Sequence, residues 1–289
     1  MEINRLIVIA IPIAVVLVGL ILINFINMID TNNDRFKPNS PHSWEKLVWS
    51  DEFDYSGLPD ENKWNFELHG PGWVNDEEQA YVKNINNSRV ENDVLIIEAR
   101  KDYTGFGYTS ARITTRYKGN WTYGRFEARI KLPSGRGIWP AFWMMPKEGK
   151  YGSWPNSGEM DIMEYVGFTP GITYGTIHCS AYNWVNGNQK GGNINVTDCE
   201  TSFHVYAIEW FPDRIDFYVD KKNYFTYKNE DNTTFMHFSV WPFDQEFYFI
   251  LNIAVGGTWG GQKGVDDSIF PQRMIVDYVR VYQNSSYQV

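Results

Sequence analysis

The chain has 289 residues, a net charge of −9 and an aromatic content of 17%. The acidic balance argues against a nucleic-acid-binding protein, because phosphate binding needs a basic patch and no Lys/Arg cluster occurs in the sequence. No long linker or repeat follows the first three dozen residues, so we expect one domain over residues 42–285, and nothing indicates an obligate protein partner.

The N-terminal segment is strongly hydrophobic. Residues 6–23 contain no charged side chain, and a stretch of this length is enough to cross a bilayer. No small-residue cleavage site follows them. We therefore expect an uncleaved signal anchor that forms a transmembrane helix within residues 1–29, followed by a flexible stalk at residues 30–41. The protein would then be membrane-anchored with its large domain outside the cytoplasm. The alternative is a cleaved signal peptide and a secreted protein.

The large domain alternates apolar and polar residues with a period of two, which predicts β-strands. Gly and Pro separate these stretches at short intervals, and no amphipathic helix of three turns is evident. Many short strands joined by glycine-rich turns are typical of a β-sandwich or a closed barrel, so we predict an all-β fold. The expected strands lie near residues 94–99, 110–116, 123–132, 173–178, 203–210, 214–227 (a hairpin), 247–255 and 276–282.

Three carboxylates, Glu159, Asp161 and Glu164, lie on one otherwise apolar strand. A regular strand would turn Glu164 away from the other two, so we predict a β-bulge around Ile162 and Met163 that brings all three to one face. A retaining glycosidase needs two carboxyl groups about 5–5.5 Å apart, and a third between them separates their pKa values. A calcium site explains the pattern less well, because it needs more oxygen ligands and a turn.

The stretch 158–167 resembles the catalytic signature of glycoside hydrolase family 16, and its Glu-X-Asp-X-X-Glu spacing is similar to the laminarinase branch. The resemblance implies a jelly-roll sandwich of two curved antiparallel sheets with a substrate cleft on the concave face. It also implies endo-hydrolysis of β-1,3-glucan with Glu159 as nucleophile, Asp161 as the pKa-tuning partner and Glu164 as acid/base. Further matching blocks are residues 49–53, 123–129, 137–143, 174–178, 251–257 and 276–282.

The resemblance also implies a set of substrate-binding side chains. These are Asn75, Arg112, Trp139, Trp143, Trp154, His178 and Trp259. The alternatives left open are the same mechanism on mixed-linkage β-glucan or an algal galactan, transglycosylation, and a non-catalytic β-1,3-glucan-recognition protein. The intact set of three acids argues against the last of these.

Catalysis by such a site requires no cofactor. Many relatives hold a structural calcium on the convex side, and the matching positions are Glu52, Asp93 and Asp277, partly through backbone oxygens, although ordinary strand-end acids are the alternative. Export to an oxidising compartment would allow a disulfide between Cys179 and Cys199, the alternative being two buried free thiols.

Overall fold

The computed structural model describes residues 44, 46–230 and 237–287. The predicted signal anchor at residues 1–29 and the stalk at residues 30–41 lie outside this part of the chain. Among the described residues, no helix has the length and apolarity needed to cross a membrane. Besides strands, this part contains four short 3-10 helices: η1 (Trp184–Asn186), η2 (His237–Ser239), η3 (Asp267–Ile269) and η4 (Ser285–Tyr287). The predicted all-β fold is confirmed.

One sheet contains ten strands. In spatial order it runs through β15 (Lys222–Lys228), β14 (Arg214–Val219), β13 (His204–Trp210), β8 (Gly124–Lys131), β17 (Gln272–Gln283), β5 (Val94–Asp102), β6 (Gly107–Ser110) and β3 (Gln79–Tyr81). In addition, β1 (Lys46–Asp51) pairs with β17, and β4 (Ser88–Glu91) pairs with β5. Pairing is antiparallel except between β3 and β6.

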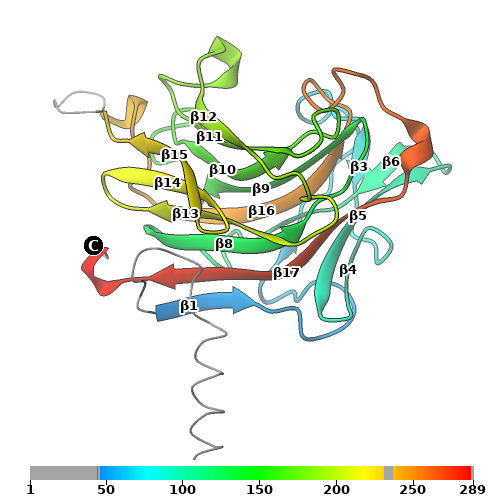
Figure 1. The fold of residues 1–289 in the computed structure, drawn as a ribbon, viewed down its shortest axis with the longest axis horizontal. Coiled ribbons are helices and arrows are strands. Elements are labelled where there is room, and N and C mark those ends of the chain that lie inside the picture. The colour runs from blue at the N-terminus through cyan, green and yellow to red at the C-terminus, as the bar shows by residue number, and fades with distance from the viewer. Residues whose placement is uncertain (1–43, 45, 231–236, 288–289) are drawn as a thin grey trace, which may run out of the picture. The chain divides into compact units, whose positions relative to one another are not determined.

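The second sheet contains seven strands and carries the candidate catalytic strand. Its spatial order is β12 (Lys190–Asn195), β11 (Ile172–His178), β10 (Glu159–Tyr165), β9 (Ile138–Pro146), β16 (Phe247–Val255), β7 (Arg112–Thr114) and β2 (Asn65–Phe66). Figure 1 shows the two sheets as stacked layers, with β9 to β11 in one layer and β8, β13 and β17 in the other. This is the predicted sandwich.

The hydrophobic core lies between the two sheets, where the period of two places the apolar side chains. Phe126, Ala128 and Ile130 of β8 are fully buried. Phe126 packs against Phe249 of β16, with ring centroids 5.8 Å apart, so side chains of the two sheets are in contact. Burying one such side chain stabilises the fold by about 1.5–3 kcal/mol.

The other face of β8 is polar, as its sequence indicates, but it is also buried. Arg125 donates to Glu127 over 2.7 Å and to Glu209 of β13 over 3.1 Å, and all three side chains are inaccessible to solvent. Trp44, which is also buried, donates its indole N–H to Glu209 over 3.0 Å. Buried charges persist in a fold when they are paired in this way.

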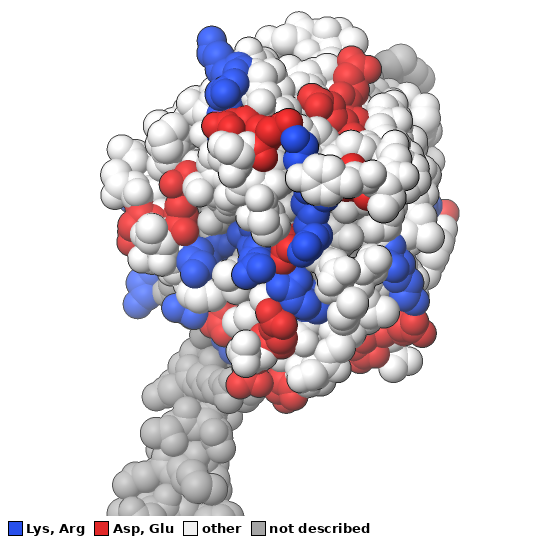
Figure 2. All heavy atoms as spheres, turned by 90° about the vertical axis from the view of Figure 1, so that its right-hand side faces the viewer, with Lys and Arg blue, Asp and Glu red and all other residues white. Residues whose placement is uncertain are grey.

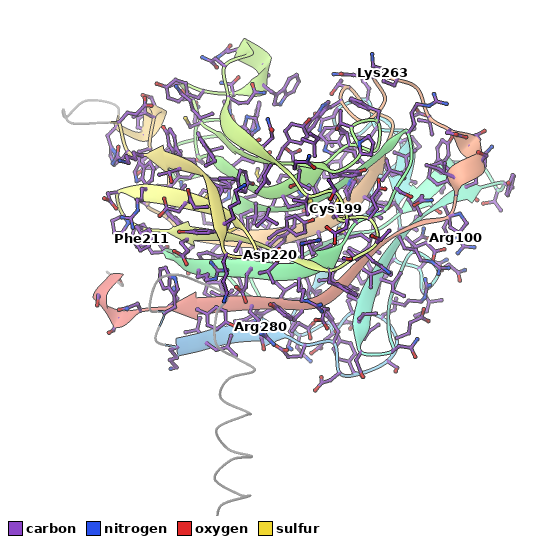
Figure 3. All side chains as sticks on the ribbon, in the orientation of Figure 1. Arg100, Cys199, Phe211, Asp220, Lys263 and Arg280 are labelled. Carbon is purple, nitrogen blue, oxygen red and sulfur yellow. The ribbon has the colours of Figure 1, made fainter. Side chains whose placement is uncertain are left out.

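The predicted disulfide is wrong, because both cysteines are free and buried. Cys179 follows the end of β11, whereas Cys199 follows β12, whose last residue Asn195 pairs with Ile172 at the start of β11. The two thiols are therefore separated by the length of β11, roughly 20 Å at a rise of about 3.3 Å per residue. A disulfide needs Cα atoms within about 7 Å. Cys199, labelled in Figure 3, instead accepts a backbone hydrogen bond from Leu132, just past β8.

Basic and acidic side chains are interleaved on the face shown in Figure 2. At this end of the sandwich, Arg89, Arg100 and Arg273 all donate to the buried carboxylate of Glu98 on β5. The structure thus gathers three arginines that the sequence separates, and it pairs them with an internal acid.

Candidate active site

Strand β10 carries the three carboxylates predicted to be catalytic. Its pairing with β11 shifts between Asp161 and Glu164, which face Thr176 and Tyr174, so three steps along β10 match two along β11. The pairing with β9 shifts in the same region. The extra residue is the predicted β-bulge, and as a result Glu159, Asp161 and Glu164 all line one cavity.

The intervening residues of β10 anchor the strand in the core. Met160, Ile162 and Met163 are at most 1% exposed. Gly158, immediately before the strand, has a φ of 86°. A Cβ there would lie 2.9 Å from both Phe243 and Pro242, so only glycine fits this turn without displacement. The local sequence therefore fixes where the acidic side chains enter the cavity.

The cleft consists of two adjoining cavities of about 450 and 580 Å³. The first extends from β10 over β9 and β16 to Arg112 on β7. The second extends over β11, where Tyr174, Thr176 and His178 line it. The residues common to both cavities are Asn75, Trp139, Glu159, Glu164 and Trp184. The two carboxylates thus stand where the halves of one long groove meet.

Each of these two carboxylates accepts a hydrogen bond from an indole. Trp154 Nε1 donates to Glu159 Oε2 over 2.5 Å, and Trp139 Nε1 donates to Glu164 Oε1 over 3.1 Å. Asp161 lies between them along the strand, with its Oδ2 3.3 Å from His178 Nε2. Two tryptophans therefore fix the orientation of the carboxylates on either side of Asp161.

Burial changes the protonation of all three acids. It raises the pKa of Glu159 to about 8, and the neighbouring Asp161 charge adds to the increase. Burial also raises the pKa of Glu164 to about 7 and holds the pKa of Asp161 well above its usual range, with the charge of Glu164 contributing. Because adjacent like charges disfavour one another, the three carboxyls titrate as a coupled group that shares its protons.

The structure places all seven predicted substrate-binding residues along this groove. Arg112, Trp143 and Trp154 line the first cavity, whereas His178 and Trp259 line the second; Asn75 and Trp139 belong to both. Trp259 packs edge-on against Trp139 and against Tyr174, with centroid distances of 5.6 and 5.0 Å.

Arg112 has contacts on several sides. Its Nε donates to Glu67. Its guanidinium lies between the rings of Trp73 and Trp143, 4.9 and 4.7 Å from their centroids. Trp73 also stacks on His69, with ring centroids 3.4 Å apart. Trp73, Arg112 and Trp143 of this stack line the first cavity.

Several cleft residues were missed by sequence analysis. Trp184 sits on η1, in a loop without periodicity, and no pattern in the sequence singles it out. Tyr174 could have been found, because it shares a strand face with His178 four residues later. Asn252 is a lone amide in the apolar strand β16, and it accepts from Trp143 over 2.8 Å.

The sequence model described as "Glycosyl hydrolases family 16" matches residues 75–280. The chain belongs to glycosyl hydrolases family 16 and is a glycosidase. It is 57% identical to the "Beta-glucanase" of Rhodothermus marinus over 249 residues, which cover 84% of this chain and 86% of that protein. It is 40% identical over 232 residues to the "Glucan endo-1,3-beta-glucosidase" of Cryptopygus antarcticus, covering 77% and 84%.

A solved structure of this family is also similar. The laminarinase from Rhodothermus marinus superimposes with a TM-score of 0.80 and 55% identity, covering 83% of this chain and 98% of that one. The two-sheet sandwich described above is therefore the jelly roll that family 16 membership implies.

Two of the three side chains at the expected calcium positions are engaged by arginine. Glu52 accepts two hydrogen bonds from Arg280, over 2.8 and 2.7 Å, and Asp277 accepts one from Arg129 over 2.6 Å. Asp93 is exposed in the turn before β5. Calcium takes about 6–8 oxygen ligands, so an ion at these positions would depend mainly on backbone oxygens. Among the described residues, the one group of three potential metal ligands is Glu159, Asp161 and His178.

Proposed function

We propose that this family 16 glycosidase cleaves internal β-1,3-linkages of a β-glucan and retains the anomeric configuration. The observation that carries the proposal is the bulged strand β10, which places Glu159 and Glu164 where the two cavities meet. A groove that continues on both sides of the reacting pair accommodates a chain on each side of the scissile bond, which supports endo-cleavage.

The reaction proceeds by two displacements. In the reactive form the shared proton is on Glu164 and Glu159 is ionised, a state that the indole of Trp154 favours. Glu159 then attacks the anomeric carbon while Glu164 gives its proton to the leaving oxygen. A glycosyl-enzyme ester forms at Glu159. Water then enters, Glu164 takes its proton, and the ester bond breaks to release the sugar. The protein's carboxyl groups and water suffice, so the reaction requires no cofactor.

Asp161 and His178 influence the protonation of Glu159 and Glu164. The charge of Asp161 raises the pKa of Glu159, so the proton distribution of the group depends on it. His178 lies opposite Glu159 across β10 and β11 and lines the second cavity, where a leaving group would lie. Its imidazole also favours the ionised forms of Glu159 and Glu164.

The choice of β-1,3-glucan rests on the relatives and on the groove walls. The Cryptopygus protein carries the name of a glucan endo-1,3-beta-glucosidase. Exposed indole faces suit the apolar faces of sugar rings, and Trp139, Trp184 and Trp259 line the groove. Mixed-linkage β-glucan and algal galactan are the rival substrates, and a recognition protein without activity would leave the three acids unexplained.

The test is digestion of laminarin, mixed-linkage β-glucan and agarose by the purified chain, with the products identified and their anomeric form followed by NMR. We expect oligosaccharides from laminarin that form first as the β-anomer. The Glu159→Gln variant should produce none. Faster release from agarose, or initial α-anomers, would contradict the proposal.

We also propose that the protein is anchored in a membrane with its catalytic domain outside the cytoplasm. The support is the uncharged stretch at residues 6–23, which precedes the folded unit. If the chain is anchored, alkaline carbonate leaves the full-length protein in the membrane pellet. Recovery of a shortened protein from the medium would support secretion instead.

A further inference from the structure

One group of side chains in the groove has the composition of a metal site. Glu159, Asp161 and His178 each offer a ligand atom, and these atoms lie within 4.8 Å of one another. Glu159 and His178 are register partners on β10 and β11, and Asp161 is two residues along the same strand. The three donors therefore stand on paired strands, which hold them close together without a flexible loop.

The group also contains an unsatisfied acceptor. Asp161 is 2% exposed, and its Oδ2 has no hydrogen-bond partner, although it lies 3.3 Å from His178 Nε2. A buried acceptor without a partner costs about 1–3 kcal/mol. An ion at this position would satisfy it.

The charge of the groove favours a cation. Glu77, Glu159, Asp161 and Glu164 line the first cavity. Among the described residues that line the two cavities, the only lysine or arginine is Arg112. Its guanidinium is paired with Glu67. A cleft with one sign of charge and apolar walls concentrates ions of the opposite sign.

We propose that Glu159, Asp161 and His178 bind a divalent transition-metal ion of the zinc type in the substrate-free groove, and that the bound ion blocks the reaction. One imidazole nitrogen and two carboxylate oxygens suit zinc, whereas calcium prefers about 6–8 oxygens. Zinc–ligand bonds of about 2.0–2.2 Å place tetrahedral ligand atoms about 3.4 Å apart, so small side-chain rotations complete the site. The fourth position faces the groove and takes water.

The bound ion would act through Glu159. A carboxylate whose lone pair is given to a metal cannot attack carbon, and an ion in the groove occupies the place of the sugar. Zinc and substrate therefore compete. The inhibition rests on the proposed role of Glu159 as nucleophile, but the binding does not.

Calorimetric titration of the EDTA-treated full chain in detergent with ZnCl₂ tests the binding. We expect one ion per chain, with binding at least about ten-fold weaker in His178→Asn and in Asp161→Asn, since even outer-shell changes cost about 10–100-fold. CaCl₂ should not bind at this site. Circular dichroism shows whether the variants remain folded.

His204 provides a matched control. It also lies between two carboxylates, Asp220 and Asp198, at 3.0 and 3.1 Å, but each of its nitrogens contacts one of them. His204→Asn should leave zinc binding unchanged. Zinc binding that survives His178→Asn, disappears in His204→Asn or is matched by calcium would overturn the proposal.

Kinetics tests the inhibition separately. Zinc should raise the apparent KM for laminarin without changing kcat. If zinc binds as expected but does not inhibit, the competition is wrong although the metal site stands. If no activity occurs even without zinc, the proposed function fails while the calorimetry still decides the site.

Discussion

Trp154 donates its indole N–H to Oε2 of Glu159 over 2.5 Å, so the turn before β10 holds one catalytic carboxylate directly. The bond stabilises the ionised form, and its loss raises the pKa of Glu159. Trp154→Phe should therefore move the acidic limb of the pH profile of kcat/KM to higher pH. A hydrogen bond to a charged group contributes about 1.5–3 kcal/mol, so we expect a loss of about 10- to 100-fold below neutral pH.

Trp184→Phe is the control for this change. Trp184 also lines the first cavity, where Trp154 lies. This variant should alter KM and leave the position of the acidic limb unchanged. An acidic limb that stays in place in Trp154→Phe would show that the indole does not tune Glu159.

Asp161→Asn should shift the acidic limb of the pH profile of kcat/KM to lower pH. The charge of Asp161 raises the pKa of Glu159, so an uncharged amide lowers it and leaves Glu159 ionised at lower pH. The measurement is the pH profile of kcat/KM on laminarin, with kcat reduced overall. A limb that moves to higher pH would contradict the electrostatic role given to Asp161.

Glu159→Gln should make the stability of the fold less dependent on pH. The pKa of Glu159 is raised from 4.5 to about 8 in the folded protein, so the folded state holds this proton more tightly than the unfolded chain. That contribution is complete below pH 4.5 and is lost as pH rises towards about 8. Gln carries no such charge.

Urea denaturation measures the free energy of unfolding. From pH 4.5 to pH 8 its value for Glu159→Gln should increase relative to that of the parent, by about 1–3 kcal/mol at pH 8. The exposed Glu148→Gln provides the control and should show no such trend. A difference that does not vary with pH would refute the assignment of a raised pKa.

The two cysteines should behave as separate buried thiols. We expect both Cys179 and Cys199 to react with a thiol reagent in denaturant without prior reduction, and neither to react in the folded protein. Reductant should leave the Tm unchanged. A single disulfide detected by mass spectrometry, or a Tm that falls with reductant, would restore the bridge expected from sequence.

The acid beneath Trp44 should be important for stability but not for chemistry. Glu209→Ala removes a carboxylate that accepts from both Arg125 and Trp44. Breaking such a buried pair costs about 3–5 kcal/mol. Urea denaturation measures the loss, and kcat/KM at a temperature where the variant is folded should equal that of the parent. A loss of activity in the folded variant would mean that Glu209 affects the geometry of the groove.

The sequence predicted the features that follow from strand periodicity. Glu159, Asp161 and Glu164 are spaced so that a regular strand cannot present them together, and that conflict predicted the bulge. The cleft residues lie on strands whose faces could be inferred, or in blocks that carry the family resemblance. These features depend on local spacing, so they could be read before the structure.

Features that depend on the tertiary arrangement could not be inferred in this way. Trp184 reaches the groove from an irregular loop, and only the folded chain shows its position. The separation of Cys179 and Cys199 depends on the hairpin that pairs β11 with β12. The polar face of β8 is typical of a solvent-exposed surface, but its Arg125 is buried and pairs with Glu209, to which Trp44, distant in sequence, also donates.

The role of Glu159 as nucleophile is tested most directly by trapping the covalent intermediate. A 2-deoxy-2-fluoro laminaribiosyl fluoride should glycosylate the protein and leave the intermediate in place, because the fluorine at C2 slows both displacements while the fluoride leaving group keeps the first one fast enough to occur. We predict a mass increase of one fluorinated disaccharide, located at Glu159 by peptide sequencing, and its loss when an acceptor sugar is added. A label on Glu164, or complete turnover by inversion without a label, would contradict the assignment of Glu159 as the nucleophile.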